Sequence, residues 1–290
     1  MAVTFDDLPA PEDSVVSDDA GTLKEMTRKL LSSIKAKHMP AVGFVNEERL
    51  YQDDNFRERV AILKMWLDAG LELGNHTFSH RSLQTTPLAA YEQDVIRGET
   101  VTKKLLRERG RKLRYFRHPF LEVGPNLETR RAFEKFLAAR GYTVAPVTVN
   151  NKEFMFAAVY ARALAHGDRE TARQVSEAYM SYMEQAFAYF EKLSVDVLGY
   201  EVRQVLLLHA DSLNSDHLND LVHMMKLRGY KFISLNQALE DKAYHEPDTY
   251  SGEDGVSWIV HWALRNGLRV PREPDVPEFV RTRYKAMSEE

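Results

Sequence analysis

The chain has 290 residues, of which 44% are hydrophobic, so it can bury a large core as one α/β barrel or as two ordinary domains. Its 39 Lys and Arg against 43 Asp and Glu residues give a net charge of −4, which provides no broad basic field for a phosphate backbone and excludes nucleic acid as an expected partner. Cysteine is absent, so disulfides and thiolate sites are excluded, and any metal must be held by His, Asp or Glu.

Strands and helices are predicted to alternate along the first half of the chain. Short apolar runs indicate strands, and apolar residues at helical spacing indicate helices. The predicted strands are 2–5, 41–45, 71–77, 113–117 and 142–149, and the predicted helices are 22–37, 56–69, 87–109 and 127–140. Parallel strands require crossover helices, so this order favours a parallel α/β fold.

The second half of the chain departs from this rhythm. Residues from about 153 to 193 are rich in Ala, Tyr, Phe and Met and are predicted to be a helical insertion. A strand at 204–208, a helix at 216–228 and a strand at 231–235 then complete about seven β/α units. We therefore predict an irregular (β/α)7-type barrel over residues 1–240, with an irregular C-terminal extension, 241–290, packed on it around one short helix near 256–265.

Polar residues end four of the predicted strands. These are Asp6 and Asp7, the segment from His76 to His80, the segment from Arg117 to Phe120, and the segment from His209 to Asp211. Active sites of parallel β/α barrels gather at the carboxyl ends of the strands. The four groups are therefore expected to meet at one mouth of the barrel.

A metal site is the chemistry that these residue types favour. His76 and His80 are four residues apart, as in helical zinc-protease motifs, but the residues between them include no Glu and the position is a strand end, which argues against a peptidase. Asp7 with the two imidazoles suits zinc or a similar divalent ion and leaves a position open for water. Asp6 beside them is a candidate catalytic base.

The motifs together resemble the polysaccharide deacetylases, the NodB-homology carbohydrate esterases. The resemblance runs from residue 2 to about residue 240 and rests on the order of the four groups, which are Thr4-Phe5-Asp6-Asp7, His76 to His80, Arg117 to Phe120 and Leu206-Leu207-Leu208-His209. It implies that Asp6 is the base, that Asp7, His76 and His80 bind the metal, most simply Zn²⁺ or else Co²⁺ or a similar ion, and that His209 is the general acid. It also implies that Arg117 pairs with Asp6 and holds it ionised, and that the backbone N–H of Phe120 donates to the oxyanion.

One motif departs from the family pattern. The family has an Asp, two residues and then Asp-Trp, where this chain has Asn150-Asn151-Lys152-Glu153-Phe154. The carboxylate that orients the catalytic histidine in the family is therefore expected to be an amide at Asn150, which weakens acid catalysis by His209. Glu153 and Asp211 are candidates to supply the missing charge.

Other polar residues are given smaller roles. His118 is expected to line the rim of the site, and the other histidines away from the strand ends to be surface or packed residues. Asn46 and Asn75 are candidates to support the ligating imidazoles.

The expected function is a metal-dependent hydrolase that removes acetyl groups from an acetylated poly- or oligosaccharide, N-linked or O-linked. Two alternatives stay open: a non-catalytic, metal-bound glycan-binding module, and a deacetylase or amidohydrolase acting on a non-carbohydrate amide. No apolar run of about 18 residues predicts a membrane span. The resemblance implies export, with any signal peptide lying upstream of Met1, and a cytoplasmic location stays open.

Overall fold

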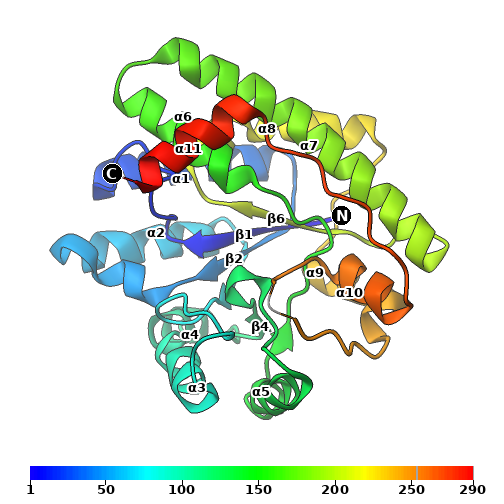
Figure 1. The fold of residues 1–290 in the computed structure, drawn as a ribbon. Helices are drawn as coiled ribbons and strands as arrows, with labels where there is room; N and C mark the ends of the chain where they lie inside the picture. Colours follow the sequence, from blue (N-terminus) through cyan, green and yellow to red (C-terminus); the bar gives the residue numbers. More distant parts are fainter. Residues whose placement is uncertain (253, 290) are drawn as a thin grey trace.

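Six parallel strands form one curled sheet in the computed structural model, which describes residues 1–252 and 254–289 (Figure 1). The strands are β1 (Ala2–Leu8), β2 (Ala41–Val45), β3 (Glu72–Asn75), β4 (Tyr115–Phe116), β5 (Thr143–Val144) and β6 (Val205–His209), in the spatial order β5-β4-β3-β2-β1-β6. The curled sheet with its surrounding helices confirms the predicted barrel-like α/β fold.

The register of the central strands brings the polar strand ends to one edge of the sheet. β1 pairs with β2 on one side and β6 on the other, and Asp6 lies directly opposite His209. β3 continues the sheet beyond β2, with Asn75 opposite both Val45 and Phe116. Since all these pairings are parallel, the carboxyl ends of β1, β3, β4 and β6 open on the same side.

The seventh strand predicted at 231–235 does not form among the described residues. The Met1 ammonium donates to Lys231 O (2.7 Å) and Ile233 N donates to Met1 O (3.0 Å), so this segment lies beside the start of β1. Ser234 then forms a capping box with Gln237 and starts helix α9 (Leu235–Leu239). Ser234 and Leu235 therefore belong to the start of a helix and do not extend a strand.

The helix predicted at 87–109 is two helices. The helices of the first half are α1 (Ala20–Ala36), α2 (Phe56–Asp68), α3 (Leu88–Arg97), α4 (Thr100–Arg107) and α5 (Leu127–Ala139), with 3-10 helices η1 (Glu47–Asp54) and η2 (Pro119–Leu121). α3 ends at Gly98, where a Cβ atom would lie 2.4 Å from the carbonyl carbon of Thr77. The break therefore lies where the loop after β3 packs directly on the glycine backbone.

The second half is mainly helical, and most of its long helices lie together on one side of the sheet (Figure 1). The predicted insertion consists of α6 (Glu153–Ala165) and α7 (Arg169–Leu198), followed by α8 (Ser212–Leu227), and α6 contacts both α7 and α8. The last segments are η3 (Lys242–His245), α10 (Trp258–Arg265) and α11 (Glu278–Ser288). α11 was not predicted, and it packs on α6 with Val280 buried. In the described part of the chain, no helix has the length and apolar character needed to cross a membrane.

Candidate metal centre and catalytic pocket

A β-bulge at the end of β1 brings two adjacent aspartates to the same site. Neighbouring side chains of a regular strand point to opposite faces of the sheet. The register between β1 and β2 shifts between Phe5 and Leu8, and Asp7 has a φ of 64°. As a result, Asp6 Oδ2 and Asp7 Oδ1 lie 3.9 Å and 3.7 Å from the same atom, His76 Nε2.

Asp7, His76 and His80 form a group that could hold a metal ion. Asp7 Oδ1 lies 3.7 Å from His76 Nε2 and 3.6 Å from His80 Nε2, too far for hydrogen bonds. Two ligands about 2.1 Å from a tetrahedral ion stand about 3.4 Å apart, which these separations approach. Asp7 Oδ1 is also buried without a hydrogen-bond partner among the described residues. The donor set therefore fits a divalent metal.

The two imidazoles are presented as neutral ligands. His76 Nδ1 lies 2.9 Å from Arg117 O, and this contact directs Nε2 toward Asp7. Burial lowers the pKa of both His76 and His80 to about 4, despite the opposing charge of Asp7. Burial would raise the pKa of Asp7, but the nearby His80, His76 and Arg49 side chains outweigh it and lower that pKa.

The loop that carries the histidines is braced through its backbone. The side chain of Asn46 donates to His76 O, and Asn75 Oδ1 accepts from Thr77 N (2.7 Å). Thr77 in turn accepts from His80 N (3.0 Å) through Oγ1. The two asparagines thus support the loop rather than the imidazole rings. Positive φ angles at Thr77 (64°) and His80 (52°) show how tightly the loop is wound.

Asp6 is buried beside Arg117, as the resemblance implied. Arg117 Nη1 lies 3.6 Å from Asp6 Oδ2, and Arg117 Nη2 donates to Thr4 Oγ1 (2.9 Å). Burial raises the pKa of Asp6 and outweighs the opposite effect of the Arg117 charge. The expected lowering by Arg117 is therefore present but smaller than the effect of burial. A carboxylate with a raised pKa is a stronger proton acceptor, which suits a base.

His209 contacts a buried glutamate. Glu153, at the start of α6, is fully buried, and its Oε2 lies 2.8 Å from His209 Nδ1. The side chain of Asn214 donates to the other oxygen of Glu153 (2.7 Å), and Asp211 also shares a hydrogen bond with Glu153. Burial and the Glu153 charge raise the pKa of Asp211, so of the two carboxyl groups Asp211 holds a proton more readily. The Glu153 carboxylate is left to accept from His209.

The charge on Glu153 changes the acid–base properties of His209. Burial lowers the pKa of His209, but Glu153, followed by Asp7 and Asp6, outweighs burial and raises it to about 9. Glu153, His209 and Asp211 are a second group close enough to ligate an ion. Their short contacts are hydrogen bonds, so the group is already satisfied without one.

Asn150 lines the pocket, and its side-chain hydrogen bond is to the neighbouring Asn151 and not to His209. Its side-chain oxygen accepts from the backbone N–H of Asn151 (2.9 Å), and Asn151 Nδ2 donates to Leu207 O (2.8 Å). The structure thus places Glu153, and not Asn150, against the histidine. The sequence signal was the position of Glu153 in the altered motif, three residues after Asn150.

The turn after β4 carries the predicted oxyanion donor. Phe120 and Leu121 both have left-handed φ angles, of 55° and 59°. The N–H groups of Leu121 and Glu122 donate to His118 O and Pro119 O, which leaves the Phe120 N–H outside the hydrogen bonds of the turn. The Phe120 ring is 55% exposed and packs edge-on against His80, with 4.4 Å between ring centroids.

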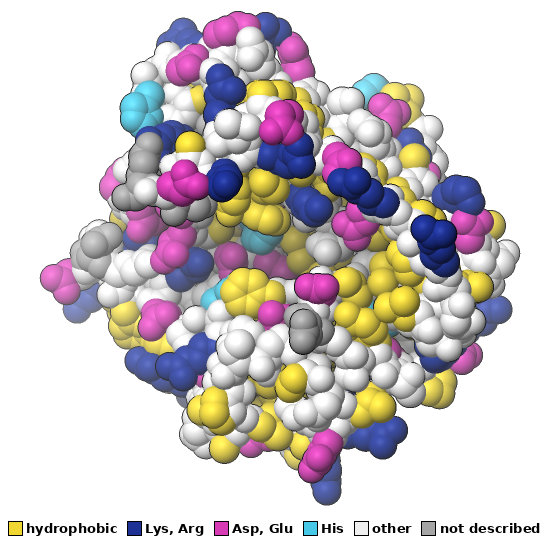
Figure 2. Space-filling view, viewed as in Figure 1, with side chains coloured by type: hydrophobic (Ala, Val, Ile, Leu, Met, Phe, Trp, Pro, Cys, Tyr) yellow, Lys and Arg dark blue, Asp and Glu magenta, His cyan; other side chains and the backbone are white. Residues whose placement is uncertain are grey.

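The strand ends meet in a pocket of about 480 Å³. Its lining includes most of the predicted site residues, namely Asp6, Asp7, His76, His80, His118, Phe120, Asn150 and His209. Further lining residues are Glu12, Asp13, Arg49, Lys152, Phe154, Gly255, Glu273 and Tyr284. Figure 2 shows a hollow on this face, with acidic and histidine side chains inside it and hydrophobic side chains around it. Lys152 and Phe154 belong to the altered motif, and no motif identifies the other additional residues in the sequence.

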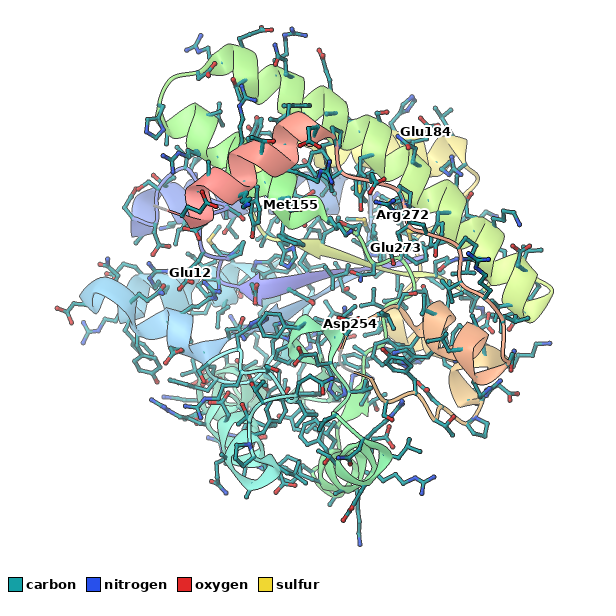
Figure 3. All side chains as sticks on the ribbon, in the orientation of Figure 1. Glu12, Met155, Glu184, Asp254, Arg272 and Glu273 are labelled. Atoms are coloured by element: carbon teal, nitrogen blue, oxygen red, sulfur yellow. The ribbon has the colours of Figure 1, made fainter. Side chains whose placement is uncertain are left out.

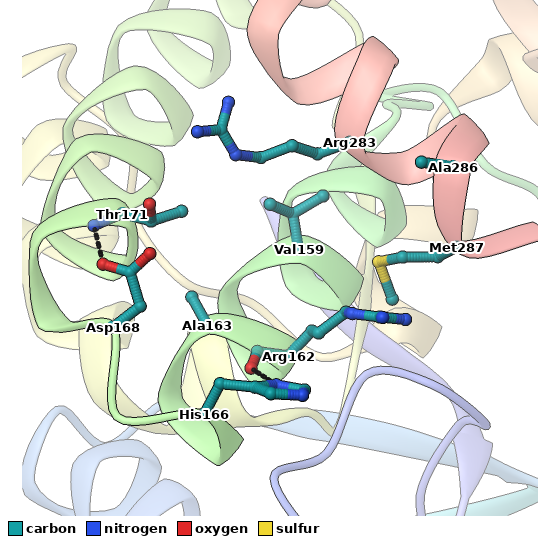
Figure 4. A pocket seen from close by; sticks show the side chains of 9 residues that line it. All are labelled: Val159, Arg162, Ala163, His166, Asp168, Thr171, Arg283, Ala286 and Met287. Carbon is teal, nitrogen blue, oxygen red and sulfur yellow. Dashed lines mark hydrogen bonds between the residues drawn. The ribbon is translucent and has the colours of Figure 1, made fainter.

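His118 lines the same pocket, as expected, but its ring is buried against Phe116 and Phe133, and burial lowers its pKa to about 3. Two further histidines lie elsewhere. His261 is buried beside Asp248. His166 lines a separate pocket of about 310 Å³ between α6, α7 and α11, where Asp168 caps α7 through Thr171 N (Figure 4). No strand-end residue lines that pocket.

Comparison with known proteins agrees with the fold and the motifs. The polysaccharide deacetylase family model matches residues 1–139. No curated protein matches the sequence significantly. A chitin deacetylase from the fungal pathogen Colletotrichum lindemuthianum is similar in structure, with 18% identity, a TM-score of 0.50, and coverage of 87% of this chain and 92% of that one.

A second similar structure is a variant, with restored enzymatic activity, of a CE4 family pseudoenzyme of Bacillus anthracis. It is 17% identical, with a TM-score of 0.50, and the alignment covers 82% of this chain and 66% of the other. The chain thus spans slightly less than two thirds of that protein. These likenesses show the fold, and the family match covers the motifs of β1 and β3. Over residues 1–139, slightly less than half of its length, the chain is therefore similar to the polysaccharide deacetylases.

Proposed function

We propose that this protein is a metal-dependent hydrolase that removes acetyl groups from an acetylated glycan. Asp7, His76 and His80 would hold the ion, with Zn²⁺ the best match to two imidazoles and one carboxylate. A bound divalent ion would supply Lewis-acid polarisation of the acetyl carbonyl and a lower pKa for water. The observation that supports hydrolysis is that a base, an acid and a metal group all line one pocket.

The base and the acid act on different protons. Asp6 takes a proton from water as the water oxygen attacks the acetyl carbon. The carbonyl oxygen becomes negative, and the Phe120 N–H donates to it. His209, with Nδ1 held by Glu153, gives a proton from Nε2 to the departing nitrogen or oxygen as its bond to carbon breaks. The products are acetate and the free amine or alcohol.

An acetylated glycan is the proposed substrate because the family acts on such polymers and because exposed aromatic rings flank the pocket. Phe120 is 55% exposed and Phe154 is 39% exposed, and both line the pocket. Aromatic faces suit the apolar faces of sugar rings. A small non-carbohydrate amide would use the same base, acid and metal but would not need these two rings.

The altered motif residues Asn150 and Phe154 favour the non-catalytic alternative, because the family has Asp and Trp at these positions. The contact between Glu153 and His209 counts against that alternative, because a buried carboxylate 2.8 Å from the ring supports the histidine in place of the missing Asp. The pair Asp6 and Arg117 would also have no use in a module that only binds glycan.

Acetate release tests the proposal. Zinc-loaded protein should release acetate from chitin oligomers, peptidoglycan or acetylated xylan, and a chelator should stop the release. Asp6→Asn should retain the metal but lose about 10²-fold or more in kcat, because the base is removed. Zinc-loaded protein that releases no acetate from any of the three would contradict hydrolysis of acetylated glycans.

A further inference from the structure

The C-terminal segment from Asp248 to Tyr284 lines the pocket from outside the sheet. We propose that this segment completes the active site, with Gly255 fixing the turn of Phe120 and Glu273 binding donor groups of the substrate. The proposal rests on the proposed function and extends it to residues that no family motif contains. Figure 3 shows Glu12 near the carboxyl end of β1 and Glu273 on the coil between α10 and α11.

Gly255 is in direct contact with the Phe120 peptide. A Cβ atom at Gly255 would lie 1.6 Å from Phe120 O and 3.0 Å from the carbonyl carbon of Leu121. These are backbone atoms, so they cannot move aside without moving the turn. Two consecutive non-glycine residues with left-handed φ angles persist only when their surroundings hold them. Gly255 lies directly against the backbone of this turn.

The segment around Gly255 is itself anchored to the body of the protein. Gln84 Nε2 donates to Gly252 O, Arg130 Nη1 donates to Tyr250 O, and Trp258 N donates to Val147 O (2.7 Å). These anchors come from three separate parts of the chain. Hydrogen bonds therefore anchor the chain both before and after Gly255, and together they hold Gly255 against the turn.

Glu273 presents a carboxylate to the same pocket. It is half-buried, and it makes no hydrogen bond or ion pair with the part of the chain that the structure describes. Burial raises the pKa of Glu273, with only the Lys152 charge opposing. A desolvated carboxylate without a donor gains most from a ligand that brings one. The hydroxyl and ammonium groups of an amino sugar are such donors, and the Phe154 ring beside Tyr284 offers an apolar face next to them.

Gly255→Ala tests the first contribution. We expect kcat for chitin oligomers to fall at least tenfold, and up to about 10²-fold, while KM and zinc content stay within twofold of wild type, because an oxyanion donor acts in the transition state. Gly21→Ala, at the start of α1, is the control, since its methyl group would approach only one carboxylate oxygen of Asp19, at 3.1 Å. Equal kcat values for Gly255→Ala and Gly21→Ala would overturn this part.

A second variant covers the case in which Gly255→Ala does not fold. Gln84→Ala removes one anchor of the segment and leaves the pocket residues unchanged. We expect a several-fold fall in kcat at unchanged zinc content. A kcat equal to that of wild type would count against the anchoring of the turn.

Glu273→Ala tests the second contribution. We expect KM for chitin oligomers to rise at least fivefold with kcat within twofold of wild type, and Glu273→Gln to recover part of the loss because its amide oxygen still accepts a hydrogen bond. Asp275→Asn, two residues away and paired with Arg272, is the matched control. A KM equal to that of wild type would overturn the role of Glu273. If the wild-type protein releases acetate and the variants do so equally well, only this inference is rejected. If the wild-type protein releases no acetate, the proposed function itself is rejected.

Discussion

Glu153 Oε2 lies 2.8 Å from His209 Nδ1, although 56 residues separate the two in the sequence. The contact fixes the orientation of the imidazole and leaves Nε2 toward Asp7 and the pocket. A carboxylate in this place also stabilises the protonated ring. Glu153 therefore takes the place that the family pattern gives to the residue at Asn150.

Removal of the Glu153 charge should reduce acid catalysis. We expect Glu153→Gln to lower kcat by about 10- to 100-fold, as loss of an orienting partner does elsewhere. Asn150→Ala should stay within about threefold of wild type, because Asn150 contacts Asn151 and not His209. Steady-state kinetics on chitin oligomers measure both. A larger loss in Asn150→Ala than in Glu153→Gln would reverse the two roles.

Zinc should stabilise the folded protein through the proposed ligands. A ligand at about 100 times its Kd adds about 2.7 kcal/mol to the free energy of unfolding, which corresponds to a rise in Tm of about 4–5 °C in a chain of this size. His80→Ala should lose most of this shift. His166→Ala, an exposed histidine in the separate pocket, should keep it. Calorimetry with and without zinc measures the Tm of wild type and of both variants. If zinc raises the Tm of His80→Ala as much as that of wild type, His80 is not a zinc ligand.

The loop after β3 depends on the glycine behind it. In Gly98→Ala the new methyl group would overlap the Thr77 and Phe78 backbone, so we expect a loss of about 1–3 kcal/mol in the free energy of unfolding and weaker zinc binding. Gly21→Ala is the control, because its methyl group approaches only one carboxylate oxygen of Asp19, at 3.1 Å. Denaturant unfolding and zinc titration give the two quantities. If the zinc affinity of Gly98→Ala equals that of wild type, the conformation of this loop does not affect zinc binding.

A buried ion pair should make stability depend on pH. Asp248 Oδ2 lies 2.9 Å from Arg130 Nη2 and 2.7 Å from His261 Nδ1. Burial opposes ionisation, but these partners outweigh it and lower the pKa of Asp248. A lowered folded-state pKa stabilises the protein above the unfolded-state value of about 3.9, and that stabilisation is lost as the pH falls below it.

Asp248→Asn should therefore destabilise the protein by about 3 kcal/mol at pH 7, the low end for a broken buried pair, because Glu134 still pairs with Arg130. The difference from wild type should stay constant between pH 7 and about 5 and shrink below about pH 4. Urea unfolding at several pH values measures it. If the difference in the free energy of unfolding between wild type and Asp248→Asn grows as the pH falls, the prediction is wrong.

Local sequence features were enough to place most strands, helices and motif residues. The strand at 41–45 has the predicted bounds, and Asp6, Asp7, His76, His80 and His209 all lie at strand ends. Hydrophobic periodicity and turn residues act within a few positions, so they can be recognised in one sequence. The family motifs belong to the same class of local signal.

Tertiary structure decided the features that depend on distant residues. The contact of Glu153 with His209, the support of the His76 backbone by Asn46, and the approach of Gly255 to Phe120 join segments 30 to 135 positions apart. The missing seventh strand and the break at Gly98 likewise reflect what packs beside them. The sequence alone thus determined which groups are available at the strand ends. Packing between distant segments decided which of these groups meet and what their charges do, because burial and neighbouring charges exist only in the folded chain.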